Sequence, residues 1–283
     1  GADAPLGLQQ LLGRDGFAGE ATSRPRAAPT MAGMSLELPW LSADPQAPFP
    51  AVSSALRAPD GLLAFGGDLS PARLLNAYSH GIFPWFSQGQ PILWWSPDPR
   101  MVFRSDGVHL PARFRRSLRR CPSQVRADTA FAEVIAACAA VPRKGQRGTG
   151  ITRGMRDAYL DLHHLGHAHS VEVFDGLRLV GGIYGVAIGR MFFGESMFSV
   201  DSGGSKVALA ALAHRLCEWG WPLIDAQVEN DHLLRLGAES WPRTHFIARM
   251  GELCHLPGPA PRPWTERFGT LPARALADSG PVD

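Results

Sequence analysis

The first regular pattern of apolar residues along the chain has helical spacing. Ser70 is followed by proline, and a serine cap with proline in the first helical position is a typical helix start. Leu74, Leu75 and Tyr78 follow and predict the buried face of this helix. Gly81 predicts its end, because glycine readily adopts the left-handed conformation that follows many helices.

Two stretches rich in aromatic residues come next, at residues 82–86 and 94–100. Two prolines in the second stretch argue against a central strand or a helix, so we expect these aromatic side chains on turns or extended loops. Aromatic side chains on loops either fill a local core or offer stacking surfaces for nucleic-acid bases. Because buried aromatic residues are common, we favour the core.

Helical spacing returns between residues 128 and 165. We expect one helix at residues 128–140, capped by Asp128, and a second that begins at Thr152 and ends before Gly166. Residues 141–150 form a basic, glycine-rich loop between them. The positions expected to face inward are Phe131, Val134, Ile135 and Cys138 in the first helix and Met155, Tyr159 and Leu162 in the second.

The apolar period then becomes alternating, which is typical of strands. Residues 170–174 and 177–188 predict two strands, and Asp175 followed by glycine predicts the hairpin turn between them. Further expected elements are a strand at residues 190–193, a helix at 205–219, a strand at 222–228 and a helix at 231–236.

This order of elements predicts an α+β protein. We expect a small N-terminal α/β module followed by an acyltransferase domain of the GNAT type, although element order alone discriminates poorly between folds. The expected domain limits are residues 34–110 and 111–258, with residues 259–283 as a C-terminal tail. Residues 1–33 are expected to be a disordered extension, because residues 1–30 are rich in Gly, Ala, Pro and Arg and lack an apolar period.

Composition narrows the class of protein. With 283 residues, 45% of them hydrophobic and 19% charged, the chain is long and apolar enough to bury a substantial core. It contains no apolar run long enough to span a membrane and no stretch with the layout of a signal peptide. Its four cysteines form no C-x-x-C pair, which argues against a disulfide framework or a zinc ribbon. We therefore expect a cytoplasmic protein.

Basic residues are distributed unevenly, although the net charge is only +2. Between Arg100 and Arg156 there are thirteen Arg or Lys residues against three acidic ones. The densest part contains Arg113, Arg116 and Arg119 and no acidic residue. Such a region suits a polyanion such as RNA, whereas the alternative is a solvated, arginine-rich face in a chain that prefers Arg to Lys throughout.

Polar residues inside an apolar strand are the strongest candidates for chemistry. Asp225 and Gln227 are two positions apart on the expected strand and should point to the same side. Burying such groups costs free energy unless they are hydrogen-bonded, so they serve either a reaction or a backbone hydrogen bond near a helix end. Glu195, in a Gly-Glu-Ser stretch, and Asn230, just beyond the strand, are further candidates.

A cluster of histidines lies between the second helix and the first hairpin strand. His163 and His167 have the spacing of a helical zinc pair, with His164 and His169 nearby. Gly166 should break the helix between them, and histidines near a helix C-terminus also suit its dipole. We therefore expect no metal site.

Several of these motifs together resemble the leucyl/phenylalanyl-tRNA–protein transferase family, over residues 39–250. The order of many motifs is far more specific than any one of them. The matching segments are residues 61–70 (GLLAFGGDLS), 81–86 (GIFPWF), 91–100 (PILWWSPDPR), 167–173 (HAHSVEV), 181–185 (GGIYG), 194–199 (GESMFS) and 224–227 (IDAQ).

The resemblance implies an activity. Enzymes of this family take Leu or Phe, and sometimes Met, from aminoacyl-tRNA and join it to a protein that begins with Arg or Lys, which marks that protein for degradation. The aminoacyl ester is already activated, so no cofactor and no metal is implied. The implied partners are aminoacyl-tRNA and proteins with N-terminal Arg or Lys, with no membrane, and we expect a monomer.

The resemblance also implies roles for individual residues. Asp225 and Gln227 would be the catalytic pair, and Glu195 with Asn230 would bind the acceptor. Trp85 would stack on the terminal adenosine of tRNA, and Arg113, Arg116 and Arg119 are expected to bind its backbone. The expected pocket for the donor side chain consists of Ile183, Phe192, Met197, Leu209, Leu216 and Ile224. Strand alternation turns Ile224 away from Asp225.

One departure from the family and several rival functions remain. Family members often carry Trp where this chain has Gly150, which removes one expected surface for the tRNA end. Rival functions on the same fold are an acetyl-CoA-dependent acetyltransferase, whose pyrophosphate loop is not found here, and a tRNA-dependent cell-wall peptide aminoacyltransferase. A rival of another class is a non-catalytic tRNA-binding module.

Overall fold

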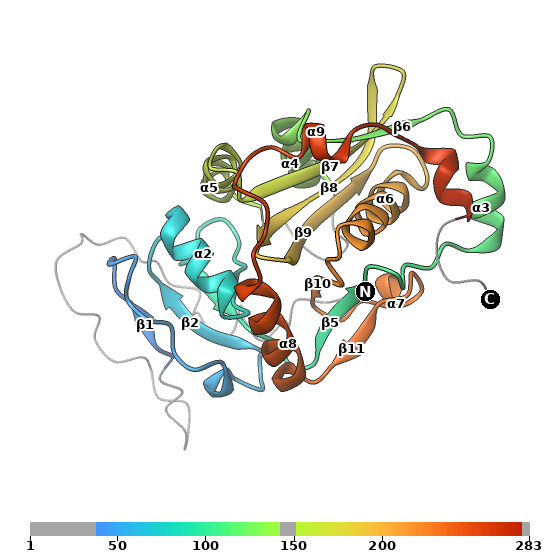
Figure 1. Ribbon diagram of the computed structural model, residues 1–283. Coiled ribbons are helices and arrows are strands. Elements are labelled where there is room, and N and C mark those ends of the chain that lie inside the picture. The colour runs from blue at the N-terminus through green and yellow to red at the C-terminus, as the bar shows by residue number, and fades with distance from the viewer. Residues whose placement is uncertain (1–37, 142–150, 279–283) are drawn as a thin grey trace.

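The computed structural model describes residues 38–141 and 151–278 (Figure 1). The predicted N-terminal extension and the greater part of the basic loop, including Gly150, lie outside these ranges. The strands are β1 (Trp40–Leu41), β2 (Leu62–Gly66), β3 (Phe83–Pro84), β4 (Leu93–Trp95), β5 (Arg100–Arg104), β6 (Gln124–Ala127), β7 (Ala168–Asp175), β8 (Arg178–Ile188), β9 (Met191–Ser199), β10 (Leu223–Gln227), β11 (Glu239–Trp241) and β12 (Leu271–Pro272). The α-helices are α2 (Pro71–Ser79), α3 (Ala112–Leu118), α4 (Phe131–Ala140), α5 (Arg153–His164), α6 (Gly204–Glu218), α7 (Asp231–Leu234), α8 (Arg243–His255) and α9 (Thr265–Phe268), and two short 3-10 helices are η1 (Val52–Ser54) and η2 (Ala273–Asp278).

The larger of two sheets has eight strands in the order β11-β5-β10-β9-β8-β7-β6-β12. Neighbouring strands are antiparallel except for β9 and β10, which run parallel. The predicted hairpin is confirmed, since β7 and β8 pair up to Asp175 and Arg178 with Gly176 in the left-handed conformation. The strand expected at residues 190–193 extends to Ser199, because β8 is long enough to pair with all of it.

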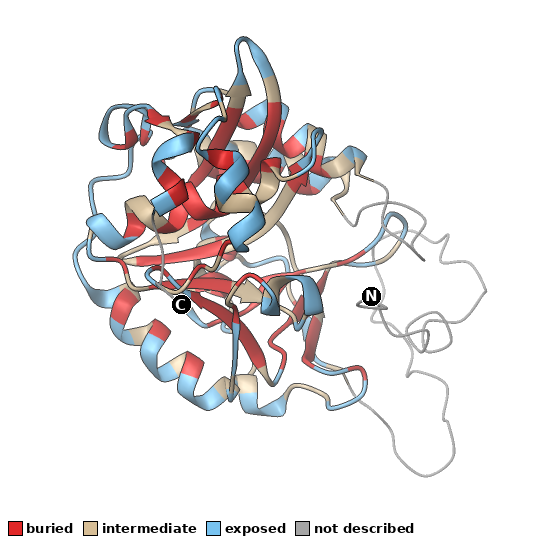
Figure 2. Cartoon of the chain, turned by 90° about the vertical axis from the view of Figure 1, so that its right-hand side faces the viewer, coloured by how far each residue is buried: buried red, intermediate tan, exposed pale blue. Residues whose placement is uncertain are grey.

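The two faces of this sheet contribute to two separate cores. On one face α6 packs with Phe192, Val171 and the segment after residue 264, and nine of its fifteen residues are buried. On the other face α4 and α5 pack together with the small N-terminal module and α8. Most strand residues are buried, with β11 an exception, while the helices keep an exposed outer side, as Figure 2 shows. The α+β class is confirmed by this arrangement.

The smaller sheet has four strands in the order β1-β2-β4-β3 and carries the aromatic stretches. Our expectation that the aromatic residues lie on turns or loops is wrong for Trp94 and Trp95, which belong to the inner strand β4, and for Phe83, which belongs to β3. Pro97 and Pro99 lie between β4 and β5, so they interrupt neither of these strands. The expectation that these aromatic side chains fill a core is confirmed for both tryptophans and for Phe83 and Phe86, whereas Trp85 is only half-buried.

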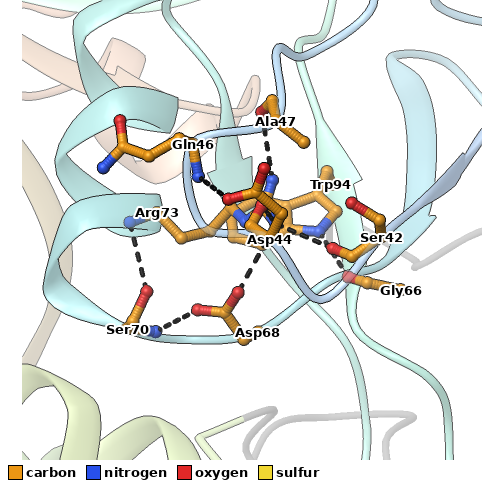
Figure 3. A network of polar contacts seen from close by, with 9 residues as sticks. All are labelled: Ser42, Asp44, Gln46, Ala47, Gly66, Asp68, Ser70, Arg73 and Trp94. Carbon is orange, nitrogen blue, oxygen red and sulfur yellow. Dashed lines mark hydrogen bonds and ion pairs between the residues drawn. The ribbon is translucent and has the colours of Figure 1, made fainter.

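Arg73 holds residues 42–47 against α2, as Figure 3 shows. Its buried guanidinium donates to the carbonyls of Ser42 (2.8 Å), Asp44 and Ala47 (3.2 Å) and lies 3.4 Å from the Asp68 carboxylate. The predicted cap is present as well, since the Ser70 hydroxyl accepts from the Arg73 backbone N–H. The Gly-Gly-Asp-Leu-Ser motif therefore builds a turn, a cap and an anchor for residues 42–47.

The prediction that Asp128 caps a helix is wrong. Helix α4 begins at Phe131, and its cap residue makes no side-chain hydrogen bond. The Asp128 carboxylate instead bonds His169 at 2.7 Å and accepts from the backbone N–H of Ser170 (2.9 Å). Tertiary partners therefore outcompete the local cap. The cap at Thr152 is confirmed, because its hydroxyl accepts from the Met155 backbone N–H.

The predicted domain limits stay predictions. Strand β5 precedes residue 110 but lies in the larger sheet, between β11 and β10. Strand β12, in the expected tail, pairs with β6 and extends that sheet at its other edge. The N-terminal module and the larger sheet also share one core.

Candidate active site

The site forms where two parallel strands separate. β9 and β10 pair through Met191–Phe193 and Leu223–Asp225, and the pairing ends there. β9 then continues along β8, and β10 continues along β5. Glu195 and Gln227 both lie just beyond this point, so their side chains can meet between the separating strands.

Two β-bulges aim these side chains. In β9, Tyr184 pairs with Ser196 and Gly185 with Gly194, which leaves Glu195 as the extra residue. In β10, the pairing with β5 shifts between Asp225 and Gln227, and Gln227 has a φ of 64°. Bulges redirect side chains and recur beside active sites. The simple alternation that we assumed for Asp225 and Gln227 therefore does not describe this strand, although the structure does bring the two residues together.

Asp225 is fully buried and ion-paired. Its Oδ1 accepts from Arg100 Nε at 2.8 Å, and its Oδ2 accepts from Arg100 Nη2 at 2.6 Å. Oδ1 also accepts from the Gln227 backbone N–H at 2.9 Å. Our sequence reasoning missed Arg100 as a site residue, and the only hint was its place at the end of a family-like motif.

Glu195 is the centre of a hydrogen-bond network from three other elements. Its Oε1 accepts from the Tyr78 hydroxyl of α2 at 2.5 Å and from Gln227 Nε2 of β10 at 2.7 Å. Its Oε2 accepts from the Tyr159 hydroxyl of α5 at 2.9 Å, and the two tyrosine hydroxyls also hydrogen-bond each other. Sequence reasoning placed both tyrosines on buried helix faces without foreseeing that they support a carboxylate.

Burial controls the ionisation of this network. It raises the pKa of Glu195 to about 7, while the hydrogen bonds from Tyr78, Tyr159 and Gln227 lower it. Burial and the nearby Glu195 charge raise the pKa of both tyrosines well above their usual value, so they remain donors. The site thus holds one carboxylate that changes charge near neutral pH.

Comparison with known proteins decides the family. The model of the leucyl/phenylalanyl-tRNA protein transferase matches residues 102–251, and the model of that family's N-terminal domain matches residues 67–98. A leucyl/phenylalanyl-tRNA–protein transferase of Xanthomonas campestris pv. campestris (strain B100) is 67% identical over 245 residues, which cover 86% of this chain and 98% of the relative. The chain belongs to the leucyl/phenylalanyl-tRNA–protein transferase family.

Other relatives agree. Transferases of the same name are 65% identical in Xanthomonas axonopodis pv. citri (strain 306), over 87% of this chain and 99% of the relative, and 63% identical in Xylella fastidiosa (strain 9a5c), over 83% and 97%. The protein is therefore an aminoacyltransferase, an enzyme that transfers an aminoacyl group from aminoacyl-tRNA to proteins. A solved structure of a functionally unknown protein from Staphylococcus epidermidis ATCC 12228 covers 64% of this chain and 68% of its own at 8% identity and a TM-score of 0.38, which is too distant to assign a fold type.

Asn230, the other residue expected to bind the acceptor, has a structural role in this transferase. Asn230 caps α7, and its Oδ1 accepts from the backbone N–H of His232 at 2.8 Å. It follows Gln227 closely in sequence, and its side chain is half-buried. The cap fixes the direction in which the chain leaves β10.

The six residues expected to form the donor pocket lie together on the α6 face of the sheet. All belong to or pack against one apolar cluster, and only Met197 is half-buried. Ile224 points away from Asp225, as strand alternation predicts, and joins this cluster. The network of Glu195 borders the core on the opposite face.

The residues expected to contact tRNA lie in two separate places. Trp85 follows β3 in the small module, and its ring lies 5.6 Å from that of Trp95. Arg113, Arg116 and Arg119 are exposed on and just after α3, where Arg119 pairs with Asp278. In Figure 1, α3 lies on the opposite side of the molecule from β1 and β2. The structure therefore does not bring the arginines next to Trp85.

The histidines serve the fold. His169 stacks on Trp264 with 3.9 Å between ring centroids, and His163 stacks on Phe131 at 4.2 Å. Within residues 38–141 and 151–278, no group of three His, Cys, Asp or Glu side chains is placed to hold a metal ion. No helix in these same ranges is long and apolar enough to cross a membrane.

Proposed function

We propose that this enzyme transfers leucine, phenylalanine or methionine from aminoacyl-tRNA to the N-terminal Arg or Lys of acceptor proteins, which marks those proteins for degradation. The observation that carries the proposal is the carboxylate of Glu195, held by Tyr78, Tyr159 and Gln227 where β9 and β10 separate. An acceptor that begins with Arg or Lys is cationic, and a fixed carboxylate suits it.

The hydrogen-bond count of Glu195 supports this role. A carboxylate has about four acceptor positions. Among residues 38–141 and 151–278, Oε1 receives the Tyr78 hydroxyl and the Gln227 amide, whereas Oε2 receives only the Tyr159 hydroxyl. One position on Oε2 is therefore left for an ammonium or guanidinium N–H of the acceptor. The tyrosines and Gln227 preorganise the carboxylate before the substrate arrives.

The reaction is aminolysis of the aminoacyl ester. The neutral α-amino nitrogen of the acceptor attacks the ester carbonyl carbon, a C–N bond forms, and the bond from that carbon to the ribose oxygen breaks. The nitrogen loses one proton and the departing ribose oxygen gains one. The Gln227 amide has no basic nitrogen, so it orients the amine and does not take the proton. We assign Asp225 and Gln227 as the catalytic pair, and Asn230 to the acceptor side.

The donor side uses other parts of the molecule. The apolar cluster of Ile183, Phe192, Met197, Leu209, Leu216 and Ile224 is the proposed pocket for the donor side chain, and an entirely apolar lining suits Leu, Phe and Met. Trp85 is half-buried, so part of its ring is open to the terminal adenosine. The exposed arginines of α3 suit the phosphate backbone.

Further features follow from the same proposal. A catalytic domain of the GNAT type is supported by the order of strands, helix, strand and helix from β7 to α7. Because its substrate is aminoacyl-tRNA, we place the enzyme in the cytoplasm, as a monomer. An aminoacyl ester is already activated, so the reaction requires no metal and no coenzyme.

The proposal is tested with labelled leucine. Leu-tRNA is offered together with a peptide that begins with Arg or with a matched peptide that begins with Ala. We expect transfer to the Arg peptide only, and its loss in Asp225→Ala. Equal transfer to both peptides would refute the acceptor specificity. Binding of tRNA without transfer would instead favour the non-catalytic tRNA-binding module.

A further inference from the structure

Arg100 is a fully buried charged group that the proposed reaction does not use. It is the first residue of β5, and its side chain is fully buried. Besides the two bonds to Asp225, its Nη1 donates to the Gly81 carbonyl at 3.0 Å. One guanidinium therefore connects β5, β10 and the turn after α2.

Two aromatic rings fix the plane of this guanidinium. Its central carbon lies 4.8 Å from the centroid of the Phe83 ring and 4.6 Å from that of Phe246. These rings come from the small module and from α8, so the side chain is positioned by elements on several sides. Lysine at this position keeps the charge but offers neither the bidentate geometry nor the planar stacking.

Asp225 transmits this position to Gln227. Its Oδ1 accepts from the Gln227 backbone N–H, two residues on, at 2.9 Å. That hydrogen bond supports a φ of 64°, which residues other than glycine seldom adopt. The Gln227 side chain leaves this turn and reaches Glu195 at 2.7 Å. The direction of the amide therefore depends on the anchored carboxylate.

We propose that Arg100 is a positioning residue for aminoacyl transfer. By holding both carboxylate oxygens of Asp225, it fixes the turn at Gln227 and thereby the direction of the Gln227 amide. This inference rests on the proposed function, in which that amide orients the acceptor amine. Asp225 accordingly acts through the backbone of Gln227, since its side chain is fully buried and both of its oxygens receive hydrogen bonds.

The test compares three Arg100 variants and the single variant Asp225→Leu by steady-state transfer of leucine to the Arg peptide. Arg100→Met removes the ion pair, Arg100→Lys keeps the charge, and Arg100→Met/Asp225→Leu replaces the pair by apolar side chains, which commonly preserves folding. The control is Arg178→Met, which removes an exposed ion pair with Asp201 from β8 of the same sheet. The folded fraction of each protein is measured by thermal unfolding.

We expect kcat of Arg100→Met to fall on the order of 100-fold, because small misplacements of an orienting group have effects of this size. KM for Leu-tRNA should change less than about twofold, because Arg100 does not contact the donor in this proposal. Arg100→Lys should fall between wild type and Arg100→Met, and Arg178→Met should match wild type. The double variant should be no slower than Asp225→Leu, because Arg100 acts through Asp225.

Three outcomes would overturn the proposal. The first is a folded Arg100→Met with the wild-type kcat. The second is a double variant in which the effects of the two substitutions multiply. The third is a loss of rate that equals the loss of folded protein in every variant. Arg100 would then contribute to stability alone. Failure of the proposed function looks different, since the wild-type enzyme would then transfer no leucine to the Arg peptide, and the positioning role would fall with it.

Discussion

At the scale of single residues, we expect two glutamates with raised pKa values to shape the response of the enzyme to pH. The pKa of both Glu195 and Glu172 is raised to about 7, chiefly by burial. Glu195 faces the proposed acceptor position. Glu172 is fully buried in β7, where Ser170 and Thr129 donate to it, and takes no part in the proposed reaction. We therefore expect Glu195 to affect activity and Glu172 to affect stability.

We predict that ionisation of Glu195 shapes the pH profile of transfer. The carboxylate must be charged to bind a cationic acceptor, and the α-amino group, with a reference pKa of about 8, must be neutral to attack. Below about pH 6.5, log kcat/KM for the Arg peptide should rise with a slope of about 2 in the wild type and about 1 in Glu195→Gln. The same slope in both proteins would show that Glu195 does not titrate in this reaction.

Glu172→Gln should change the pH dependence of stability. Because its pKa is higher in the folded than in the unfolded chain, the wild type loses stability as pH rises from about 4.5 through about 7. That loss is of order 3 kcal/mol at most. The Tm of Glu172→Gln minus the Tm of the wild type should therefore be more positive at pH 8 than at pH 5. Glu133→Gln, at an exposed position of α4, serves as the control and should show no such difference.

At the scale of elements, strand separation and bulges shape the candidate site, and helix α3 exposes basic side chains. The pairing of β9 and β10 ends at Phe193 and Asp225, and the side chains of Glu195 and Gln227 meet just beyond that point. Helix α3 differs from these strands, because its Arg113 and Arg116 are exposed to solvent. Their exposure suits contact with a flexible polyanion.

Charge reversal on α3 should weaken tRNA binding without unfolding the protein. In Arg113→Glu/Arg116→Glu we expect Tm within about 2 °C of wild type, because exposed substitutions cost little. The slope of log affinity against log salt should become shallower by about 1 for each phosphate that the arginines no longer neutralise. The control Arg262→Glu reverses one charge, and so makes half of this charge change, at an exposed position of the C-terminal segment. Unchanged affinity and slope in the α3 variant would remove these arginines from the tRNA interface.

At the scale of the whole molecule, the C-terminal segment closes over the larger sheet. The chain after α8 passes Gly166, where an added Cβ would lie 2.4 Å from the backbone nitrogen of Arg262. Trp264 then stacks on His169, and β12 pairs with β6. Trp264, Phe268 and Leu271, from the segment expected as a tail, are therefore part of the core on the α6 face.

Gly166→Ala should measure how much this close approach matters. Gly166 and Gly220 both follow a helix with positive φ, of 78° and 73°, but only Gly166 has backbone atoms close to the position of an added Cβ. Gly220→Ala should cost about 1 kcal/mol of unfolding free energy, from backbone strain alone. Gly166→Ala should cost a further 1–3 kcal/mol, roughly, because the segment at Arg262 must move. Equal decreases in unfolding free energy, measured with denaturant, would show that the segment yields freely.

The sequence by itself determined most helices, the central hairpin and the family. Caps at Ser70 and Thr152, and the apolar faces of α4, α5 and α6, depend on residues only three or four positions apart. The same local reasoning failed at Asp128, where partners from β7 and from Trp264 replace the cap.

Only the tertiary structure decided how the site is built. Arg100 meets Asp225 across 125 positions of sequence, and Tyr78 meets Glu195 across 117. The bulges at Glu195 and before Gln227 arise from the registers of β8 and β5, which neither strand encodes alone. Sequence could name Glu195, Asp225 and Gln227 because the family motifs mark them. It could not name Arg100 as their anchor, because a charged residue after a proline acquires that role only when the folded chain removes it from water and places a carboxylate opposite.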